Sequence, residues 1–311
     1  MSETKDHLSN AACIINPEAA HKKWRRRKRL KKLLDQELPG QKFDIPADKN
    51  NMIAFVRKIS PAFTTIIAMG GDGTIADVLQ GIRAAGREKD VLLGIVPLGS
   101  GNAFRKSLAI PKNVRRALRV LREGEAREVN LMEIEGCLCG FSSIGATAGA
   151  SDEARRQKVK GFWGHVLAGL GLLSLPLWEV EAELEDGVDA DGARFDKKNL
   201  SLKILDCVVA KSNYFGYSWR IAPQASLDDD YLDITFYEMP GWKYALLLPL
   251  TFFGLYQRRL KNFKARKLVL RGQGLPVQYH GEYLGTRDRV EVKAQPRAIR
   301  IIAPARTSRK R

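Results

Sequence analysis

Short apolar runs alternate with helical patterns over roughly the first 130 residues of the chain. Ala11 to Ile15, Thr64 to Met69 and Val91 to Val96 have the length and composition of buried strands. Helical patterns follow, one with Val78, Leu79 and Ile82 on a common face and one over Asn113 to Arg122. Because short buried strands alternating with helices are typical of a parallel sheet covered on both faces, the pattern predicts a doubly wound α/β domain.

The pattern changes near residue 130, where strand-like runs take over. These runs are Val129–Glu135, Leu138–Ser142, Trp178–Leu184, Leu200–Ala210, Leu232–Tyr237, Lys267–Leu270, Val290–Val292 and Ala298–Ile302. Helical patterns interrupt them at Ser151–Leu173 and Trp242–Asn262. We therefore expect an α/β domain over residues 1–130, a mainly antiparallel, β-sandwich-like domain over 131–304, and a basic tail at 305–311. The last strands are candidates to return to the first domain.

Composition narrows the class of protein. Four scattered cysteines are too few for a disulfide framework, and no second pair joins Cys137 and Cys139 to make a zinc site. The polar N-terminus is not typical of a secretory signal, and no apolar run is long enough to span a bilayer. We expect a soluble cytoplasmic chain. Its net charge of +17 predicts an anionic partner, which could be nucleic acid, nucleotide or an anionic membrane.

Glycine-rich loops directly follow two of the apolar runs. Gly70-Gly71-Asp72-Gly73-Thr74 lies between a strand and a helix, Gly99-Ser100-Gly101-Asn102 follows the next strand, and Asn16-Pro17 follows the first strand. Glycines let the backbone approach a phosphate, and a helix N-terminus offers it unpaired N–H donors. A single such segment could also be an ordinary tight turn with an Asp cap. Three loops at adjacent strand ends favour one ligand-binding edge instead.

These loops, together with Ile110-Pro111, resemble the diacylglycerol kinase catalytic family, which includes sphingosine and ceramide kinases and soluble bacterial lipid kinases. The resemblance continues in order through Ser143-Ile144-Gly145, Lys160-Gly161, Asn213-Tyr214-Phe215-Gly216, Ala222-Pro223 with Ala225, Leu232-Asp233 and Gly281-Glu282. It covers residues 11 to 304. Each motif alone is weak, but the ordered set is specific.

The resemblance implies roles for particular residues. The nucleotide site would comprise Asn16, Pro17, Glu18, Ala19, Ala20, Gly70, Gly71, Asp72, Gly73, Thr74, Ile75, Ala76, Asp77, Gly99, Ser100, Gly101 and Asn102. Glu282 matches the family's catalytic glutamate, which accepts the proton of the substrate hydroxyl, and Asp72 matches an aspartate of a water–magnesium network. In a loop that holds a structural magnesium, the ligands would be the Asp229 carboxylate and the main-chain carbonyls of Ser226 and Tyr231.

Five positions depart from the common family pattern. Ala103 and His280 stand where aspartate is common, Asp230 stands where glycine is usual, and Ala19-Ala20 replaces a small polar residue and glycine. The string Gly-Ser-Gly-Asn-Ala at 99–103 resembles the sphingosine kinase branch instead.

The resulting hypothesis is a lipid kinase that uses ATP and Mg²⁺ to phosphorylate a hydroxyl of a membrane lipid, of the diacylglycerol or sphingoid type. Two alternatives stay open. One is a non-catalytic relative that binds anions or membranes, and the other is an enzyme like NAD kinase, which shares the GGDGT segment. No nucleic-acid-binding motif is present, so nucleic acid is not expected as a partner. The sequence does not set the oligomeric state, and a homodimer is one option.

Two segments are candidates for membrane contact. Nine of the eleven residues from Lys22 to Lys32 are Lys or Arg, with Trp24 among them. The apolar run Tyr244–Tyr256 is followed by several cations, and Gly169–Trp178 is a second apolar run. Each has an ordinary interpretation as a solvated or a core helix. The functional interpretation is peripheral association with the anionic inner face of a membrane.

Overall fold

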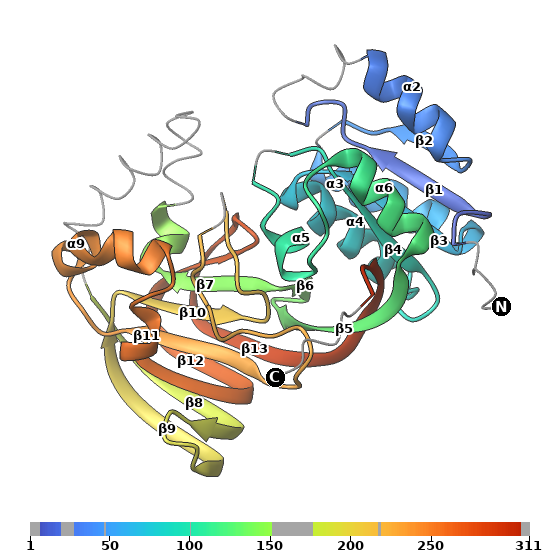
Figure 1. Cartoon of the computed structure of the whole chain (residues 1–311). Coiled ribbons are helices and arrows are strands. Elements are labelled where there is room, and N and C mark those ends of the chain that lie inside the picture. The colour runs from blue at the N-terminus through green and yellow to red at the C-terminus, as the bar shows by residue number, and fades with distance from the viewer. Residues whose placement is uncertain are drawn as a thin grey trace. The chain divides into compact units, whose positions relative to one another are not determined.

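The computed structural model divides into two compact units (Figure 1). It describes residues 7–19, 28–46, 48–99, 101–150, 177–216 and 219–305. The N-terminal unit comprises residues 1–129 and 297–311, and the C-terminal unit comprises residues 130–296. Strands β5 (Glu125–Ile134) and β13 (Glu282–Ala303) contribute residues to both units. Over the described ranges, no helix combines the length and the apolar character needed to cross a bilayer.

The N-terminal unit is a parallel sheet flanked by helices, as the alternation of strands and helices predicted. Its strands are β1 (Ala11–Ile15), β2 (Gln41–Asp44), β3 (Thr65–Gly70) and β4 (Leu92–Pro97). Its helices are α2 (Lys28–Glu37), α3 (Lys49–Ile59), the short 3-10 helix η1 (Ser60–Ala62), α4 (Asp72–Ala84), α5 (Ala103–Ser107) and α6 (Val114–Glu123). The sheet order is β2-β1-β3-β4, and the C-terminal end of β13 pairs in parallel with β4.

Three central strands of this sheet end at the same edge. Every residue of β1, β3 and β4 is buried, which explains why these strands are continuous apolar runs in the sequence. In the register, Ile15 of β1 lies opposite Met69 of β3, and Gly70 lies opposite Pro97 of β4. The loops that follow the three strands therefore begin side by side.

The C-terminal unit is antiparallel, also as predicted. Its strands are β6 (Cys137–Cys139), β7 (Phe141–Gly145), β8 (Trp178–Asp189), β9 (Arg194–Ile204), β10 (Asp206–Ala210), β11 (Leu232–Tyr237) and β12 (Lys261–Tyr279), with the first part of β13. Its helices are α9 (Gly241–Phe252) and the short 3-10 helix η3 (Gln257–Arg259). Strands β11, β10, β7 and β12 pair in that order, and β12 pairs again with β11.

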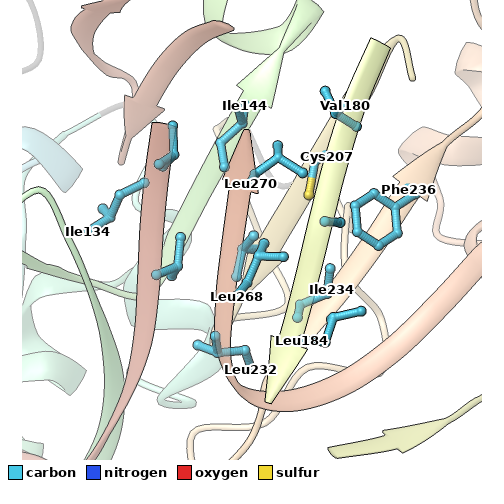
Figure 2. Close-up of a cluster of buried hydrophobic side chains, with 14 of the residues drawn as sticks. Ile134, Ile144, Val180, Leu184, Cys207, Leu232, Ile234, Phe236, Leu268 and Leu270 are labelled. Carbon is cyan, nitrogen blue, oxygen red and sulfur yellow. The ribbon is translucent and has the colours of Figure 1, made fainter. Parts of the chain in front are cut away.

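Alternating side chains of these strands make one apolar core. Val180 and Leu184 of β8 point to the same side as Leu268 and Leu270 of β12, and all four are buried (Figure 2). Strand β11 adds Leu232, Ile234 and Phe236 to the same cluster. Along β8, buried residues alternate with more exposed ones, as expected when one face of an antiparallel sheet covers a core, whereas every residue of β7, β10 and β11 is buried.

Several predicted boundaries differ from the observed ones. The run Leu138–Ser142 is divided between β6 and β7, and Leu200–Ala210 between β9 and β10. The helix predicted at Trp242–Asn262 ends at Phe252, because the chain turns at Gly254, whose φ is +76°. The helical prediction Ser151–Leu173 lies outside the described residues. The basic run predicts a further helix over about Glu18 to Leu34, and its described part, from residue 28 onward, belongs to α2.

Candidate active site

Asn16 ties the loop after β1 to the loop after β3. Its backbone N–H donates to the carbonyl oxygen of Met69 at 3.0 Å, and its side-chain Nδ2 donates to Oγ1 of Thr74 at 3.0 Å. Its Oδ1 accepts a hydrogen bond from the N–H of Glu18 at 2.9 Å, which closes the turn through Pro17. Asn16 and Thr74 are 58 positions apart in the sequence. Their hydrogen bond therefore brings the Asn16-Pro17 turn and the Gly-Gly-Asp-Gly-Thr segment together. Ala20 and Ser100 lie outside the described residues.

The two glycine-rich loops are packed backbone against backbone. The N–H groups of Leu98 and Gly99 both donate to the carbonyl oxygen of Gly70, at 2.9 and 3.1 Å. A Cβ added at Gly99 would lie 2.4 Å from the Cα of Gly71 and 3.0 Å from its nitrogen. No side chain larger than hydrogen fits this approach without moving one loop, so the sequence requires glycine at position 99.

The N-terminus of α4 is left open by these contacts. Gly71 is its N-cap residue, and no side chain of the described residues caps it. A Cβ added at Gly73 would meet no heavy atom of the described chain within 4 Å. The first N–H groups of a helix lack intrahelical partners and carry the positive end of the helix dipole. This end of α4 therefore combines open space with the donors that a phosphate group requires.

Asp72 connects the first loop to the second through its carboxylate. Its Oδ2 accepts from the N–H of Ala103 at 2.9 Å, and its Oδ1 accepts from the N–H of Phe104 at 3.0 Å. Asp72 thus caps the N-terminus of α5 from a neighbouring loop, and both of its oxygens are engaged in that role. Ala103 is buried at this junction. Its methyl group stands where the resemblance noted in the sequence would place an aspartate.

Asn102 completes the junction in a left-handed conformation, with φ of 50° and ψ of 50°. Its side chain is fully buried, and its Nδ2 donates to the carbonyl oxygen of Gly99. Its Oδ1 has no hydrogen-bond partner within the described part of the chain. Asparagine tolerates this backbone region better than most residues, which accounts for its place after the glycines.

A group of cations on and beside α5 was not anticipated from the sequence. Arg105 donates from Nη1 to the carbonyl oxygen of Ile110 at 2.7 Å. Burial lowers the pKa of the Arg105 guanidinium, and the neighbouring Asp72 carboxylate opposes that change. Burial also lowers the pKa of Lys106, and repulsion from Arg105 and Lys112 adds to this lowering. The region next to the loops is therefore electropositive, which favours an anionic ligand.

Glu282 lies in the C-terminal unit at the start of β13, directly after the hairpin turn from β12. His280 and Gly281 have φ values of 47° and 85°, as a two-residue type I′ turn requires, and Tyr279 pairs with Glu282. The Nε2 of His280 accepts from the N–H of Gly140 at 3.0 Å, and the backbone N–H of His280 donates to the carbonyl oxygen of Phe141 at 3.1 Å. His280 thus holds the turn in place, and the partly exposed Glu282 side chain is presented on it.

The predicted magnesium loop contains a lysine ammonium. The Nζ of Lys211 lies 2.6 Å from the carbonyl oxygen of Asp229, 2.6 Å from its Oδ1 and 2.6 Å from the carbonyl oxygen of Tyr231. Ser226 accepts a hydrogen bond from Asp228 through its hydroxyl, at 3.1 Å. Across the described residues, no three His, Cys, Asp or Glu side chains gather as metal ligands. Two of the three expected magnesium ligands, the Asp229 carboxylate and the Tyr231 carbonyl oxygen, are already bonded to this ammonium, so the residues present do not fit the ion here.

Helix α9 has two apolar faces. Tyr244 and Thr251 are buried, and the ring of Tyr244 lies edge-on to that of Tyr237 at 5.4 Å. The opposite face carries large apolar side chains that are exposed, and the row continues past the end of the helix. Its members are Trp242, Leu246, Leu250, Phe253 and Leu255. Exposed cations accompany it, namely Lys243, Arg258, Arg259 and Lys261. Of the other two candidates for membrane contact, the residues of the basic segment before position 28 and of the apolar run before position 177 lie outside the described ranges.

Comparison with known proteins gives a family match in each of the two units. Residues 10–134 match the family described as diacylglycerol kinase catalytic domain, and residues 183–303 match the YegS C-terminal NAD kinase beta sandwich-like domain. A Pseudomonas aeruginosa protein named "Probable lipid kinase YegS-like" is 30% identical over 256 residues, which is 79% of each chain. The diacylglycerol kinase of Bacillus subtilis is 30% identical over 180 residues, covering 55% of this chain and 54% of that one.

The fold is also that of a solved relative. A crystal structure of a diacylglycerol kinase from Bacillus anthracis superposes with a TM-score of 0.72 at 17% identity, covering 98% of this chain and 99% of that chain. The α/β unit with its three joined loops and the antiparallel β unit thus define a two-part kinase architecture. The chain belongs to the diacylglycerol kinase catalytic family of lipid kinases.

Proposed function

We propose that the protein transfers the γ-phosphoryl group of ATP to a hydroxyl of a membrane lipid, of the diacylglycerol or sphingoid type. The observation that carries this proposal is the junction of three loops at one edge of the parallel sheet. Asn16 is bonded to Thr74, Gly71 is in contact with Gly99, and the N-terminus of α4 is open beside them. Phosphoryl transfer depends mainly on positioning and charge stabilisation, which such a junction supplies.

In this proposal the phosphates of ATP lie against the first turn of α4. The N–H groups after Gly71 donate to phosphate oxygens, and Gly73 and Gly99 let the backbone approach them. The cations Arg105 and Lys106 add favourable potential nearby. Magnesium would arrive as part of the ATP complex and neutralise phosphate charge, and Asp72 would act by fixing α5 against the loop.

Glu282 is proposed as the general base. The oxygen of the lipid hydroxyl attacks the γ-phosphorus, the bond from that phosphorus to the β,γ-bridging oxygen breaks, and ADP leaves. The proton of the hydroxyl passes to the Glu282 carboxylate. The rigid type I′ turn and the His280–Gly140 hydrogen bond support this role, because a base must be held in a fixed orientation.

The test is transfer of label from γ-labelled ATP to lipids in mixed micelles, with magnesium present. The panel should include diacylglycerol, a sphingoid base, ceramide and phosphatidylglycerol, with NAD as a soluble acceptor. We expect one lipid to be labelled and Glu282→Gln to lower turnover by roughly 10²- to 10⁴-fold while ATP still binds. Near-normal turnover in Glu282→Gln would reject the base. Labelling of NAD alone would favour an NAD kinase activity, and ATP binding without any labelled acceptor would favour a non-catalytic relative.

We also propose that α9 docks on an anionic membrane, because the acceptor hydroxyl lies at a lipid surface. The helix exposes Trp242, Leu246 and Leu250 on one side, with cations on and after it, and this combination suits an interfacial helix. Leu246 is 74% exposed, so Leu246→Glu should not disturb folding. We expect this change to weaken binding to vesicles containing anionic lipid several-fold, as measured by flotation. Leu246→Ala, with the same backbone and no added charge, should weaken it less, and unchanged flotation of Leu246→Glu would reject the docking face.

A further inference from the structure

Lys211 is a fully buried lysine at the centre of an oxygen cage in the C-terminal unit. Its ammonium has three N–H donors, and three oxygens lie 2.6 Å away: two on Asp229 and one on Tyr231. Each of the three N–H donors of the ammonium therefore has an oxygen to bond to, and none is left over. One carboxylate oxygen and two carbonyl oxygens are also the kind of donors that a hard cation selects.

The strand register explains how this lysine reaches the cage. Strands β10 and β11 are antiparallel, and Ala210 lies opposite Asp233. Lys211 follows Ala210 directly, so it lies beside the residues that precede Leu232, and Tyr231 is one of them. The N–H of Lys211 donates to the carbonyl oxygen of Gly140 at 2.8 Å. The backbone is therefore fixed, and the side chain crosses directly into the loop.

Neighbouring groups fix the loop around the ammonium. The side-chain Nδ2 of Asn130 donates to the carbonyl oxygen of Asp229, and its backbone N–H donates to that of Leu227 at 2.9 Å. The second carboxylate oxygen of Asp229 accepts from Nζ of Lys264 at 2.6 Å. Burial alone would raise the pKa of Asp229, but the two lysines outweigh it and hold that pKa below its ordinary value. The carboxylate is thus charged and fully bonded.

We propose that the Lys211 ammonium replaces a divalent cation in this loop, so that residues 226–231 reach their folded conformation without bound metal. The cage is then a cation site whose occupant is covalently attached. Two consequences follow. Added magnesium or calcium should not stabilise the wild-type protein through this loop, and removal of the ammonium should leave an oxygen cage that accepts a divalent ion.

The test compares thermal unfolding in EDTA with unfolding in millimolar MgCl₂ or CaCl₂, without nucleotide, for the full chain and for Lys211→Ala. We expect the same unfolding temperature in all buffers for the wild type. Lys211→Ala should unfold roughly 10 °C lower in EDTA, because a buried charge loses its partner, and should regain much of that loss with calcium or magnesium. Lys264→Ala is the matched control, since it takes an ammonium from the same carboxylate but leaves Lys211 in the cage. It should show no metal response.

Two outcomes would overturn the proposal. One is a wild-type unfolding temperature that rises with magnesium or calcium, with the rise lost in Asp229→Asn, since the loop would then hold a metal beside the lysine. The other is a folded Lys211→Ala protein that gains nothing from either ion, since the ammonium would then not stand in for a cation. The wild-type and Asp229→Asn measurements decide the question even if Lys211→Ala does not fold.

Discussion

The two units differ in whether their polar groups already have partners within the chain. In the N-terminal unit, backbone N–H groups at the start of α4 are left open, and glycines keep side chains away from them. In the C-terminal unit, the oxygens around Lys211 are all engaged by side-chain donors that belong to the chain itself. We propose the first region as an anion site that is open to a ligand, and the second as a cation site that the Lys211 ammonium fills.

This difference predicts which substitutions matter in each region. An open site made of backbone is damaged by adding atoms, because a new Cβ occupies the space that the ligand or the facing loop requires. A filled site made of side chains is damaged by removing atoms, because a buried charge or donor then loses its partner.

Gly99→Ala, which adds a single methyl group, should lower ATP affinity and stability more than any other glycine-to-alanine change proposed in the N-terminal unit. Its Cβ would lie 2.4 Å from the Cα of Gly71, so the two loops must separate. We expect ATP affinity to fall by roughly 100-fold or more, and the free energy of unfolding to fall by about 1–3 kcal/mol through overpacking. Isothermal titration with a non-hydrolysable ATP analogue and urea unfolding measure the two effects separately.

Gly73→Ala is the matched control for that change. Its Cβ meets no heavy atom in the described chain within 4 Å, and alanine is the better helix former by about 1 kcal/mol. We therefore expect Gly73→Ala to be at least as stable as the wild type, but to bind ATP about 10-fold less tightly, because its methyl enters the proposed phosphate space. Unchanged ATP affinity in Gly73→Ala would contradict the position proposed for the phosphates.

Asp72→Ala should weaken the junction between the two loops. The N–H groups of Ala103 and Phe104 would lose their acceptors, and both residues are buried. Leaving two buried donors without partners should lower the free energy of unfolding by about 2–3 kcal/mol, and ATP affinity should fall with it. Asp72→Asn keeps one oxygen acceptor and should lose less stability. If Asp72→Ala instead unfolds like the wild type but loses all turnover, its main role is catalytic and not that of a cap.

Much of the N-terminal site could be predicted from the sequence, because its determinants are local. Strand β1 was placed at its observed bounds, and the three loops follow strands that share one edge of a parallel sheet. Adjacency of the loops follows from that topology alone. The elements β2 and α3 were not predicted. Strand β2 has four residues, none of them fully buried, and a strand with that pattern leaves little hydrophobic signal.

The filled cation site could not be predicted, because it depends on contacts between distant segments. Lys211 reaches Asp229 and Tyr231 across 18 and 20 positions, and Lys264 joins the same carboxylate from 35 positions away. A single lysine after an apolar run is most often a solvated residue, so nothing in the sequence distinguishes Lys211 from a surface lysine. The resemblance to a family with magnesium in this loop pointed to a metal instead, and the register of β10 and β11 is what changes that interpretation.

Asp206 gives a second test within the C-terminal unit, because it is a buried carboxylate that forms no ion pair with any ammonium of the described residues. Its Oδ2 accepts from the N–H of Thr147 at 3.1 Å, and its Oδ1 has no hydrogen-bond partner in the described ranges. Burial raises the pKa of Asp206 from 3.8 to about 7, although the bonds to Thr147 and Cys207 oppose that rise. Asp229 shows the contrary direction, because two lysines contact it.

The raised pKa of Asp206 sets the sign of its pH dependence. As pH rises from about 4 to 7, the unfolded chain releases this proton while the folded protein retains it, so the free energy of unfolding falls across that window. Asp206→Asn removes the titration, and we expect its free energy of unfolding to fall by about 4 kcal/mol less than that of the wild type between pH 4 and pH 8, since each pKa unit corresponds to about 1.4 kcal/mol. Urea unfolding at both pH values measures the difference. Parallel pH profiles would mean that Asp206 is already ionised when folded, and that burial without a cationic partner does not govern charge in this unit.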